Sequence, residues 1–415
     1  MSNAALPTPR ADDAPVAPDA PLRATLQSTL QSTLQSTLRS TIPALDGVRG
    51  VAILAVLAHQ LCIDGYPVHG AARAVMLPLQ VGWVGVQLFF VLSGFLITGV
   101  LLDTRRAQNY WSSFFMRRSL RIFPLYYVLL VLTFLVVPRL FDLPAAMLAE
   151  HRHAAWYWLY VSNWASLAHV EGVEPLGHCW SLSVEEQFYL LWPLAVRAFG
   201  DRGLARLCVA VAVAALLLRM GIRVGGANPE LAYALTPARA DALTLGALAA
   251  ILVRHDDWLA RITPHLGRLL AASGALLAVV ALAGGLLSRT NPVTQTAGYT
   301  LLAVASALLI VRVTVDTARG EGRLVAALSS PLLRRFGKHS YAIYVFHLPL
   351  HLLFVRRVIT PRLGAMSQST FLGVQVAYMV LGTFALLLLG IVSYRLIEQP
   401  FLDLKRFFTT RATPA

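Results

Sequence analysis

Charged residues are scarce in this sequence. Asp, Glu, Lys and Arg make up 13% of its 415 residues, which is about half the share found in an ordinary soluble domain. Apolar residues reach 57%, and the mean hydropathy is +0.62. This composition excludes a soluble globular protein and predicts a protein whose helices cross a membrane several times.

Cysteine is also rare. The three cysteines, Cys62, Cys179 and Cys208, lack the spacing of metal ligands, and their odd number cannot give a complete set of disulfides. Free thiols are therefore favoured, with a Cys62–Cys179 disulfide as the alternative. No metal site is expected from these residues.

The sequence contains many long apolar runs. A helix needs about 20 apolar residues to cross the hydrocarbon core of a bilayer, and about ten runs approach that length. The predicted fold class is all-α, a polytopic membrane helix bundle of about ten transmembrane helices. The shorter segment 155–169 is rich in Trp and Tyr and suits an interfacial or re-entrant helix better. The expected spans are residues 44–63, 82–102, 122–138, 181–197, 204–221, 234–253, 266–287, 296–312, 340–356 and 372–396.

Basic residues are distributed unevenly between the loops that join these spans. If the N-terminus is cytoplasmic, the loops on that side hold most of the arginines, for example Arg105 and Arg106. This asymmetry follows the positive-inside rule, and an even number of spans places the C-terminus in the cytoplasm as well. We therefore interpret the basic residues behind the net charge of +14 as signals that orient the spans and as contacts to anionic headgroups of the inner (cytoplasmic) membrane. No basic run is interleaved with aromatic residues, so no nucleic-acid partner is expected.

The two ends of the chain differ from its apolar middle. Residues 1–40 contain the repeat TLQSTLQSTLQSTLRST and are interpreted as a disordered, low-complexity cytoplasmic tail. An interfacial amphipathic helix, with leucine at every fourth position, is the alternative. Residues 41–400 are expected to form the transmembrane domain, and residues 401–415 a short cytoplasmic tail.

Several polar residues fall inside the expected spans, where they are costly and usually functional. His59 must find a partner or line an aqueous cavity, and its side chain suits proton transfer. Arg118 and Arg121 share one helical face, where they either bind phosphates or carboxylates or only mark topology. Glu185 and Glu186 either cap a helix start or, being about 100° apart, place at least one carboxylate toward the bundle interior.

Two further polar pairs lie in later spans. Arg239 and Asp241 are expected to offset each other's charge. His347 and His351 lie four residues apart on one face, which is a spacing found in zinc sites, but no third ligand accompanies them. No metal site is therefore predicted here either.

Seven motifs follow one another in a specific order: LDGVRG, FFVLSGFLIT, RRSLRIFPLYY, WSLSVEEQFYLLWPL, RADALTLGAL, SYAIYVFHLPL and SYRLIEQP. Together they resemble acyltransferase family 3 of integral membrane acyltransferases, from about residue 43 to residue 400. The resemblance implies transfer of an acyl group, most often acetyl, from acyl-CoA in the cytoplasm to a hydroxyl. It implies sugars of surface polysaccharides, lipopolysaccharide or their lipid-linked precursors as acceptors. Acyl-CoA would be a co-substrate, and no tightly bound cofactor is expected.

The resemblance also assigns roles to individual residues. By motif position, His59 corresponds to the catalytic histidine of the family and Glu185 to its acidic motif residue. A histidine can take the proton of a hydroxyl, and a carboxylate can orient the histidine ring. Arg49, Arg118 and Arg121 correspond to positions that bind acyl-CoA or stabilise the oxyanion. Secondary candidates are His347, Glu186, Arg239 and Asp241.

One departure from the family pattern affects the first motif. The family has ten residues between the arginine and the histidine, whereas the nine residues GVAILAVLA separate Arg49 from His59. On an α-helix this spacing leaves the two side chains about 80° apart. Either a tightened turn restores the alignment or His59 acts from a shifted angle. Gln60 stands at the position around the helix where the histidine of the family would lie relative to the arginine.

A secondary transporter, exporting a modified glycan or a small metabolite, is the competing class, since many spans with buried charges also suit a carrier. Carriers often consist of two similar halves, and no convincing internal repeat is visible in this sequence. The sequence does not indicate an oligomeric state.

Overall fold

A computed structural model describes residues 33, 37, 38, 42–140, 150–170, 172–320 and 322–411. Within these ranges all regular structure is helical and no strand is present, so the all-α prediction is confirmed. The predictions for the tail 1–40 fall outside the described residues, apart from the three isolated positions. Of the predicted tail 401–415, the described residues continue as short helices, α19 (Gln399–Asp403) and η11 (Leu404–Phe408).

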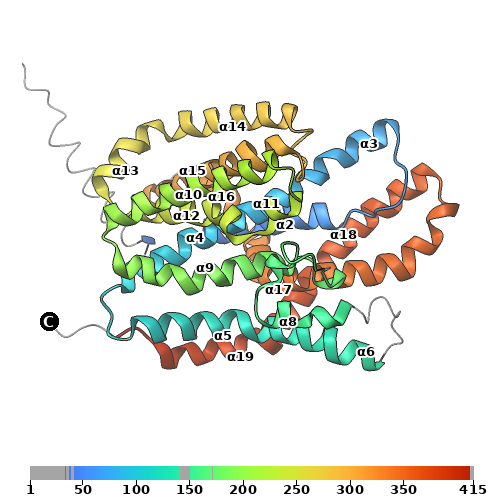
Figure 1. The fold of residues 1–415 in the computed structure, drawn as a ribbon, viewed down its shortest axis with the longest axis horizontal. Coiled ribbons are helices and arrows are strands. Elements are labelled where there is room, and N and C mark those ends of the chain that lie inside the picture. Colours follow the sequence, from blue (N-terminus) through green and yellow to red (C-terminus); the bar gives the residue numbers. More distant parts are fainter. Residues whose placement is uncertain are drawn as a thin grey trace, which may run out of the picture.

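Long helices lie side by side and make one bundle (Figure 1). In the described ranges, eight helical stretches are long and apolar enough to cross a membrane by length and composition. Their main helices are α4 (Val84–Thr104), α5 (Tyr110–Val131), α10 (Asp201–Val224), α12 (Thr236–Leu252), α14 (Leu266–Ala283), α15 (Tyr299–Arg319), α17 (Pro331–Phe354) and α18 (Gln368–Ser393).

Two more helices of the bundle, α2 (Pro43–Gln60) and α9 (Cys179–Ala198), are long but less apolar. They coincide with the expected spans 44–63 and 181–197. Asp46, Arg49 and His59 lower the mean hydropathy of α2, and Glu185 and Glu186 lower that of α9. Polar motif residues therefore explain why these two helices fall below the hydropathy of the eight apolar stretches.

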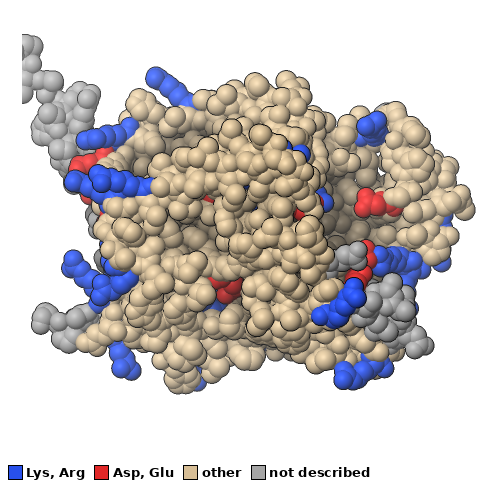
Figure 2. Space-filling model, viewed as in Figure 1, with Lys and Arg blue, Asp and Glu red and all other residues tan. Residues whose placement is uncertain are grey.

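Several short elements lie at the two ends of the bundle. Figure 1 shows α13 (Asp256–Ile262) at the left end and α3 (Gly70–Met76) and α6 (Val137–Leu140) at the right end, with α8 (Ala154–Trp158) nearer the middle. The segment 155–169 contains only α8 and one turn of 3-10 helix, so it has no long helix, as predicted. Figure 2 shows that Lys, Arg, Asp and Glu gather mainly toward these ends, whereas the broad middle is almost uncharged. An uncharged band of this kind is what a lipid environment requires.

Glycines bring α4 and α12 into direct backbone contact. A methyl group at Gly94 would lie 1.9 Å from the carbonyl oxygen of Leu243, and one at Gly246 would lie 1.9 Å from that of Val91. The two contacts are reciprocal, so neither helix can carry a larger side chain there. Small residues at such crossings are the usual means of close helix packing in membranes.

Glycines also bring α2 and α17 into direct backbone contact. A methyl group at Gly50 would lie 2.1 Å from the carbonyl oxygen of Leu333, and one at Gly337 would lie 1.8 Å from that of Asp46. The first half of α2, including Arg49, is thereby fixed against α17. This pair forms one wall of the site described next.

Candidate active site

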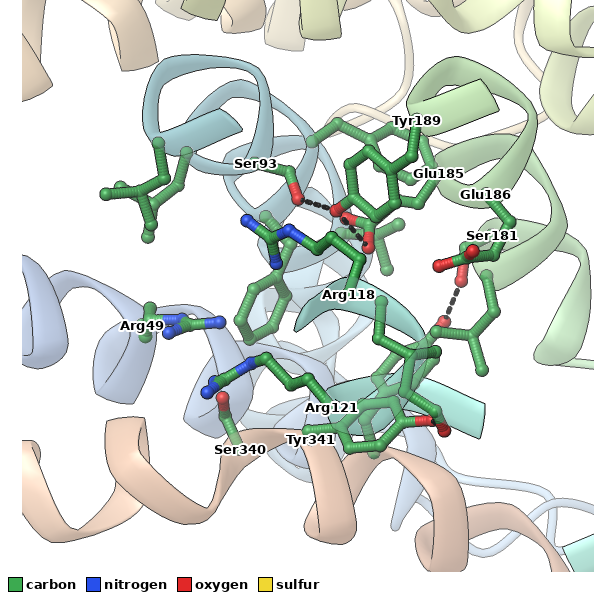
Figure 3. Close-up of a pocket in the computed structure, with 18 residues that line it drawn as sticks. Arg49, Ser93, Arg118, Arg121, Ser181, Glu185, Glu186, Tyr189, Ser340 and Tyr341 are labelled. Atoms are coloured by element: carbon green, nitrogen blue, oxygen red, sulfur yellow. Dashed lines mark hydrogen bonds between the residues drawn. The ribbon is translucent and has the colours of Figure 1, made fainter. Parts of the chain in front are cut away.

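Helices α2, α4, α5, α9 and α17 enclose a pocket with a free volume of about 90 Å³ (Figure 3). The wall also has an apolar part, which includes Phe89, Phe90 and Leu96. The polar lining residues are Arg49, Ser93, Arg118, Arg121, Ser181, Glu185, Glu186, Tyr189, Ser340, Tyr341 and Tyr344. The structure thus brings together five of the residues that the sequence singled out.

Three arginines line one side of the pocket. Arg49 comes from α2, and Arg118 and Arg121 lie one turn apart on α5, so that all three guanidinium groups approach one another in Figure 3. Within the described ranges, none of the three forms a hydrogen bond or a salt bridge with a carboxylate. Three unpaired cations this close together make a strong binding site for an anion.

Glu185 takes part in a hydrogen-bonded chain across the pocket. The hydroxyl of Tyr189 donates to Glu185 Oε2 at 3.1 Å, and the hydroxyl of Ser93 is hydrogen-bonded to that of Tyr189. Since a hydroxyl has a single proton, Ser93 is the donor to Tyr189. The chain fixes the carboxylate of Glu185 from a neighbouring helix, which is the arrangement expected of a preorganised polar group.

Glu186 lines the same pocket at a different angle. Its Oε1 atom is buried and has no hydrogen-bond partner among the described residues. The sequence predicted that at least one of the two adjacent glutamates faces the interior, and both do. A buried oxygen without a partner normally indicates a group that binds something else, such as water or substrate.

Hydroxyl groups on α9 and α17 complete the polar lining. Ser181 and Tyr344 are hydrogen-bonded to each other at 2.6 Å, and the Tyr341 hydroxyl donates to the carbonyl oxygen of Ile122 at 2.6 Å. Sequence reasoning missed these residues, together with Ser93 and Tyr189. The signal was present in the motif SYAIYVF, where Ser340, Tyr341 and Tyr344 stand on adjoining faces of an otherwise apolar helix.

His59 lies outside this pocket. It is one of the last residues of α2, its Cβ is packed close to Gly82, and its buried Nδ1 atom has no hydrogen-bond partner among the described residues. Because α2 is a continuous α-helix from Pro43 to Gln60, no tightened turn realigns His59 with Arg49. The shifted angle is therefore the alternative that the structure adopts.

His347 is completely buried one turn beyond Tyr344. Its ring centre lies 4.9 Å from that of His178, which precedes α9. His351 is hydrogen-bonded to the hydroxyl of Tyr378 at 2.9 Å. In the part of the chain that the structure describes, no group of three His, Cys, Asp or Glu side chains is arranged to hold a metal ion, and the three cysteines are free.

Arg239 and Asp241 do not pair as expected. Asp241 forms a salt bridge of 2.7 Å with Arg219, and both side chains are 0% exposed. Thr300 donates a further hydrogen bond to Asp241 at 2.9 Å. Residues two apart on a helix point about 200° apart, so Arg239 and Asp241 form no direct ion pair, although Asp241 is close enough to Arg239 to offset part of its charge. Arg219 was overlooked, although an arginine inside the apolar span 204–221 was a sufficient signal.

Arg239 instead lies inside an aromatic cage. Its Nη2 atom donates to Gln87 Oε1 at 2.5 Å, while its Nε and Nη1 atoms have no hydrogen-bond partner among the described residues. Cation–π contacts stabilise the buried charge in place of a carboxylate. The four rings around it belong to Phe90, Trp180, Tyr233 and Tyr299.

Fold and site together define a class: a multi-pass membrane protein whose helices enclose a pocket lined by three arginines, two carboxylates and several hydroxyls. Within this class the chain belongs to the acyltransferase family, because residues 42–395 match the family model described as an acyltransferase domain. The match covers nearly the whole range over which the motifs indicated the family.

The chain is similar to several named O-acetyltransferases. It is 27% identical over 375 residues to the peptidoglycan O-acetyltransferase OatA of Listeria monocytogenes, which is 86% of this chain and 55% of that protein. It is 28% identical over 379 residues to the O-acetyltransferase OatA of Staphylococcus aureus, covering 86% and 57%. It is 30% identical over 376 residues to the putative peptidoglycan O-acetyltransferase YrhL of Bacillus subtilis, covering 86% and 54%. The chain thus spans little more than half the length of these relatives. No solved structure matches it.

Proposed function

We propose that this protein is an O-acyltransferase that moves an acyl group, in the first instance acetyl, from acyl-CoA to a hydroxyl of a cell-surface glycan or of its lipid-linked precursor. The observation that carries the proposal is the pocket itself, where three unpaired arginines face two glutamates and several hydroxyls between apolar helices. Family membership supports acyl transfer. The relatives named as peptidoglycan O-acetyltransferases make peptidoglycan the first acceptor to test.

The arginines are proposed to hold the donor. Coenzyme A carries several phosphate charges, and guanidinium groups bind phosphates through two parallel hydrogen bonds. Arg118 and Arg121 have no competing carboxylate partner in the described ranges, which supports this role. Arg49 is then placed to stabilise the oxyanion that forms when the thioester carbonyl is attacked.

His59 is proposed as the general base and Glu185 as the carboxylate that orients the reacting groups. In the reaction, the acceptor oxygen forms a bond to the acyl carbon, its proton goes to the base, and the carbon–sulfur bond breaks. The sulfur of coenzyme A finally takes up the proton. His59 lies beyond the wall of the pocket, so its action there requires a path for the proton between its imidazole and the pocket.

For the membrane arrangement we propose ten crossings, with α2 and α9 in addition to the eight apolar stretches, and both termini in the cytoplasm. The support is that α2 and α9 run within the same bundle as the others (Figure 1), and that Gln108, in the loop between α4 and α5, donates a backbone hydrogen bond to Arg411, the last described residue. The inner (cytoplasmic) membrane is the proposed location because acyl-CoA is a cytoplasmic donor. The transporter alternative has no support from the family match.

A direct assay tests the proposal. Membranes that contain the protein are incubated with radiolabelled acetyl-CoA and with peptidoglycan fragments or other surface glycans, and the products are identified by mass spectrometry. Acetylated glycan should form only with the intact protein, and it should disappear when Arg118 and Arg121 are both replaced by Ala. Absence of acyl transfer to every glycan offered, at a normal level of inserted protein, would refute the proposed function.

A further inference from the structure

Two buried histidines face each other just beyond the pocket. The rings of His178 and His347 have their centres 4.9 Å apart at an interplanar angle of 70°. The residues are 4% and 0% exposed. They come from different parts of the fold, since His178 precedes α9 and His347 lies on α17.

Hydrogen bonds to the backbone determine which nitrogen of each ring carries the proton. His347 Nδ1 lies 2.6 Å from the carbonyl oxygen of Tyr344, and His178 Nε2 lies 3.2 Å from that of Val345. A carbonyl oxygen only accepts, so these two nitrogens are the donors. The other nitrogens, His347 Nε2 and His178 Nδ1, are therefore acceptors in the neutral rings.

These two acceptor nitrogens are buried and have no hydrogen-bond partner in the described part of the chain. Buried polar atoms in folded proteins are nearly always satisfied, and an exception normally indicates a bound water molecule or a functional role. Two such atoms on neighbouring rings are what a pair bridged by water requires. The two rings do not form a metal site, because no third His, Cys, Asp or Glu ligand lies beside them among the described residues.

The pair adjoins the pocket on one side and the helix that carries His59 on the other. On one side, the ring of Tyr344 lies 5.2 Å from that of His347, and its hydroxyl is hydrogen-bonded to Ser181 on the pocket wall. On the other side, α2 and α17 run in the same direction from their contact at Gly50 and Gly337, so His59 and His347, nine and ten residues further along, lie at a similar level of the bundle. His59 Nδ1 is likewise buried and without a partner among the described residues.

We propose that His347 and His178 form a buried proton relay that connects His59 to the pocket hydroxyls of Tyr344 and Ser181, with water bridging the free nitrogens. The relay rests on the proposed acyl transfer and gives His59 access to a pocket that it does not line. The charged and titratable groups around it are Asp64 and Arg289 near His59, and His351 and Tyr344 beside His347.

The relay balances the reaction without any further reagent. The acceptor oxygen forms its bond to the acyl carbon and releases its proton through the pocket hydroxyls to an imidazole nitrogen. The carbon–sulfur bond breaks, and the same proton returns along the relay to the sulfur of coenzyme A. Each imidazole ends in its starting state, and nothing is oxidised or reduced.

Kinetics provide the first test. His347→Gln and His178→Gln should each lower kcat by about 10²-fold, the lower end for loss of a proton-transfer group, and should raise the solvent deuterium isotope effect. KM for acyl-CoA should stay unchanged because the arginines are untouched. His351→Gln is the matched control on the next turn of α17, and it should retain wild-type kcat. An equal loss in the control, or normal kcat in both relay variants, would overturn the relay.

Nuclear magnetic resonance of protein labelled with ¹⁵N-histidine tests the relay without the reaction. His59→Gln should shift the imidazole signals of His347 and His178 and leave that of His255, which follows the end of α12 and contacts Asp201, unchanged. Unshifted His347 signals refute the relay even if the enzyme is active. Shifted signals in a protein that transfers no acyl group support the relay and refute the proposed acyl transfer.

Discussion

The guanidinium carbon of Arg118 lies 5.2 Å from the centre of the Tyr189 ring, and the hydroxyl of the same tyrosine donates to Glu185. One aromatic side chain therefore supports both the cationic and the anionic side of the pocket. The ring face stabilises Arg118 without occupying any of its N–H groups. All of those donors stay available for an anion.

Replacing Arg118 or Arg121 by Lys should weaken binding of acyl-CoA, although the positive charge is retained. The planar fork that binds a phosphate through two hydrogen bonds is lost. We expect KM for acyl-CoA to rise about tenfold, which corresponds to roughly 1.4 kcal/mol. Arg117→Lys is the control, since Arg117 is exposed and does not line the pocket. Unchanged donor affinity in both variants would leave these arginines as topology signals only.

His59→Ala should reduce acyl transfer strongly while the protein remains inserted and folded. Removing a general base typically costs about 10²–10⁴-fold in rate. Gln60→Ala, at the neighbouring position, should have a much milder effect, because a glutamine cannot exchange a proton near neutral pH. The measurement is the initial rate of acyl transfer at matched protein levels. If His59→Ala keeps more than about a tenth of the wild-type rate, His59 is not the base.

Single substitutions can distinguish the contribution of the Tyr189 hydroxyl from that of the Glu185 carboxylate on α9. Tyr189→Phe keeps the ring beneath Arg118 but removes the hydrogen bond to Glu185, and we expect a loss of about tenfold in kcat. Glu185→Gln removes the charge itself and should cost at least about 10²-fold. Glu186→Gln, which breaks no hydrogen bond in the described ranges, should have the smallest effect. The reverse order would make Glu186 the catalytic carboxylate.

Asp241→Ala should destabilise the bundle, because it leaves Arg219 buried without its counter-charge. Breaking a buried ion pair by removing one partner typically costs about 3–5 kcal/mol. Replacing both residues together by Leu should recover most of the loss, since no charge is then left unpaired. The free energy of unfolding in mixed detergent micelles measures the effect. Equal stability of the single variant and the wild type would show that the pair is energetically neutral.

Labelling of single cysteines tests the proposed ten-span arrangement. With Cys62 replaced by Ser, an impermeant maleimide added outside intact cells should modify cysteine introduced at Asn291. It should not modify cysteine introduced at Asp257, which lies at the start of the helical stretch Asp256–Ala283, whereas Asn291 follows the end of that stretch. Modification of the Asp257 site from outside would reverse the orientation, and modification of both sites would contradict the crossing of α14.

The fold class and much of the site follow from local sequence. Apolar runs predict long helices, and a spacing of three places Arg118 and Arg121 on one face wherever the helix packs. The bond between Ser93 and Tyr189 joins residues 96 positions apart and depends on how α4 packs against α9. The same holds for the pair Arg219–Asp241, whose partner is chosen by the contact between α10 and α12. Helical periodicity gives the direction of a side chain but not the residue that it meets.

The two less apolar helices have a consequence for how the protein is made. On biological insertion scales, a charged residue at the centre of a helix costs about 2.5–3.5 kcal/mol on entering lipid. α2 emerges from the ribosome early with Arg49, yet the helix that glycines fix against it, α17, begins only at Pro331. Until then the polar face of α2 has only its earlier neighbours to shield it from lipid. The pocket can therefore close only after α17 has been inserted, so a chain that ends before Pro331 lacks one wall around its arginines.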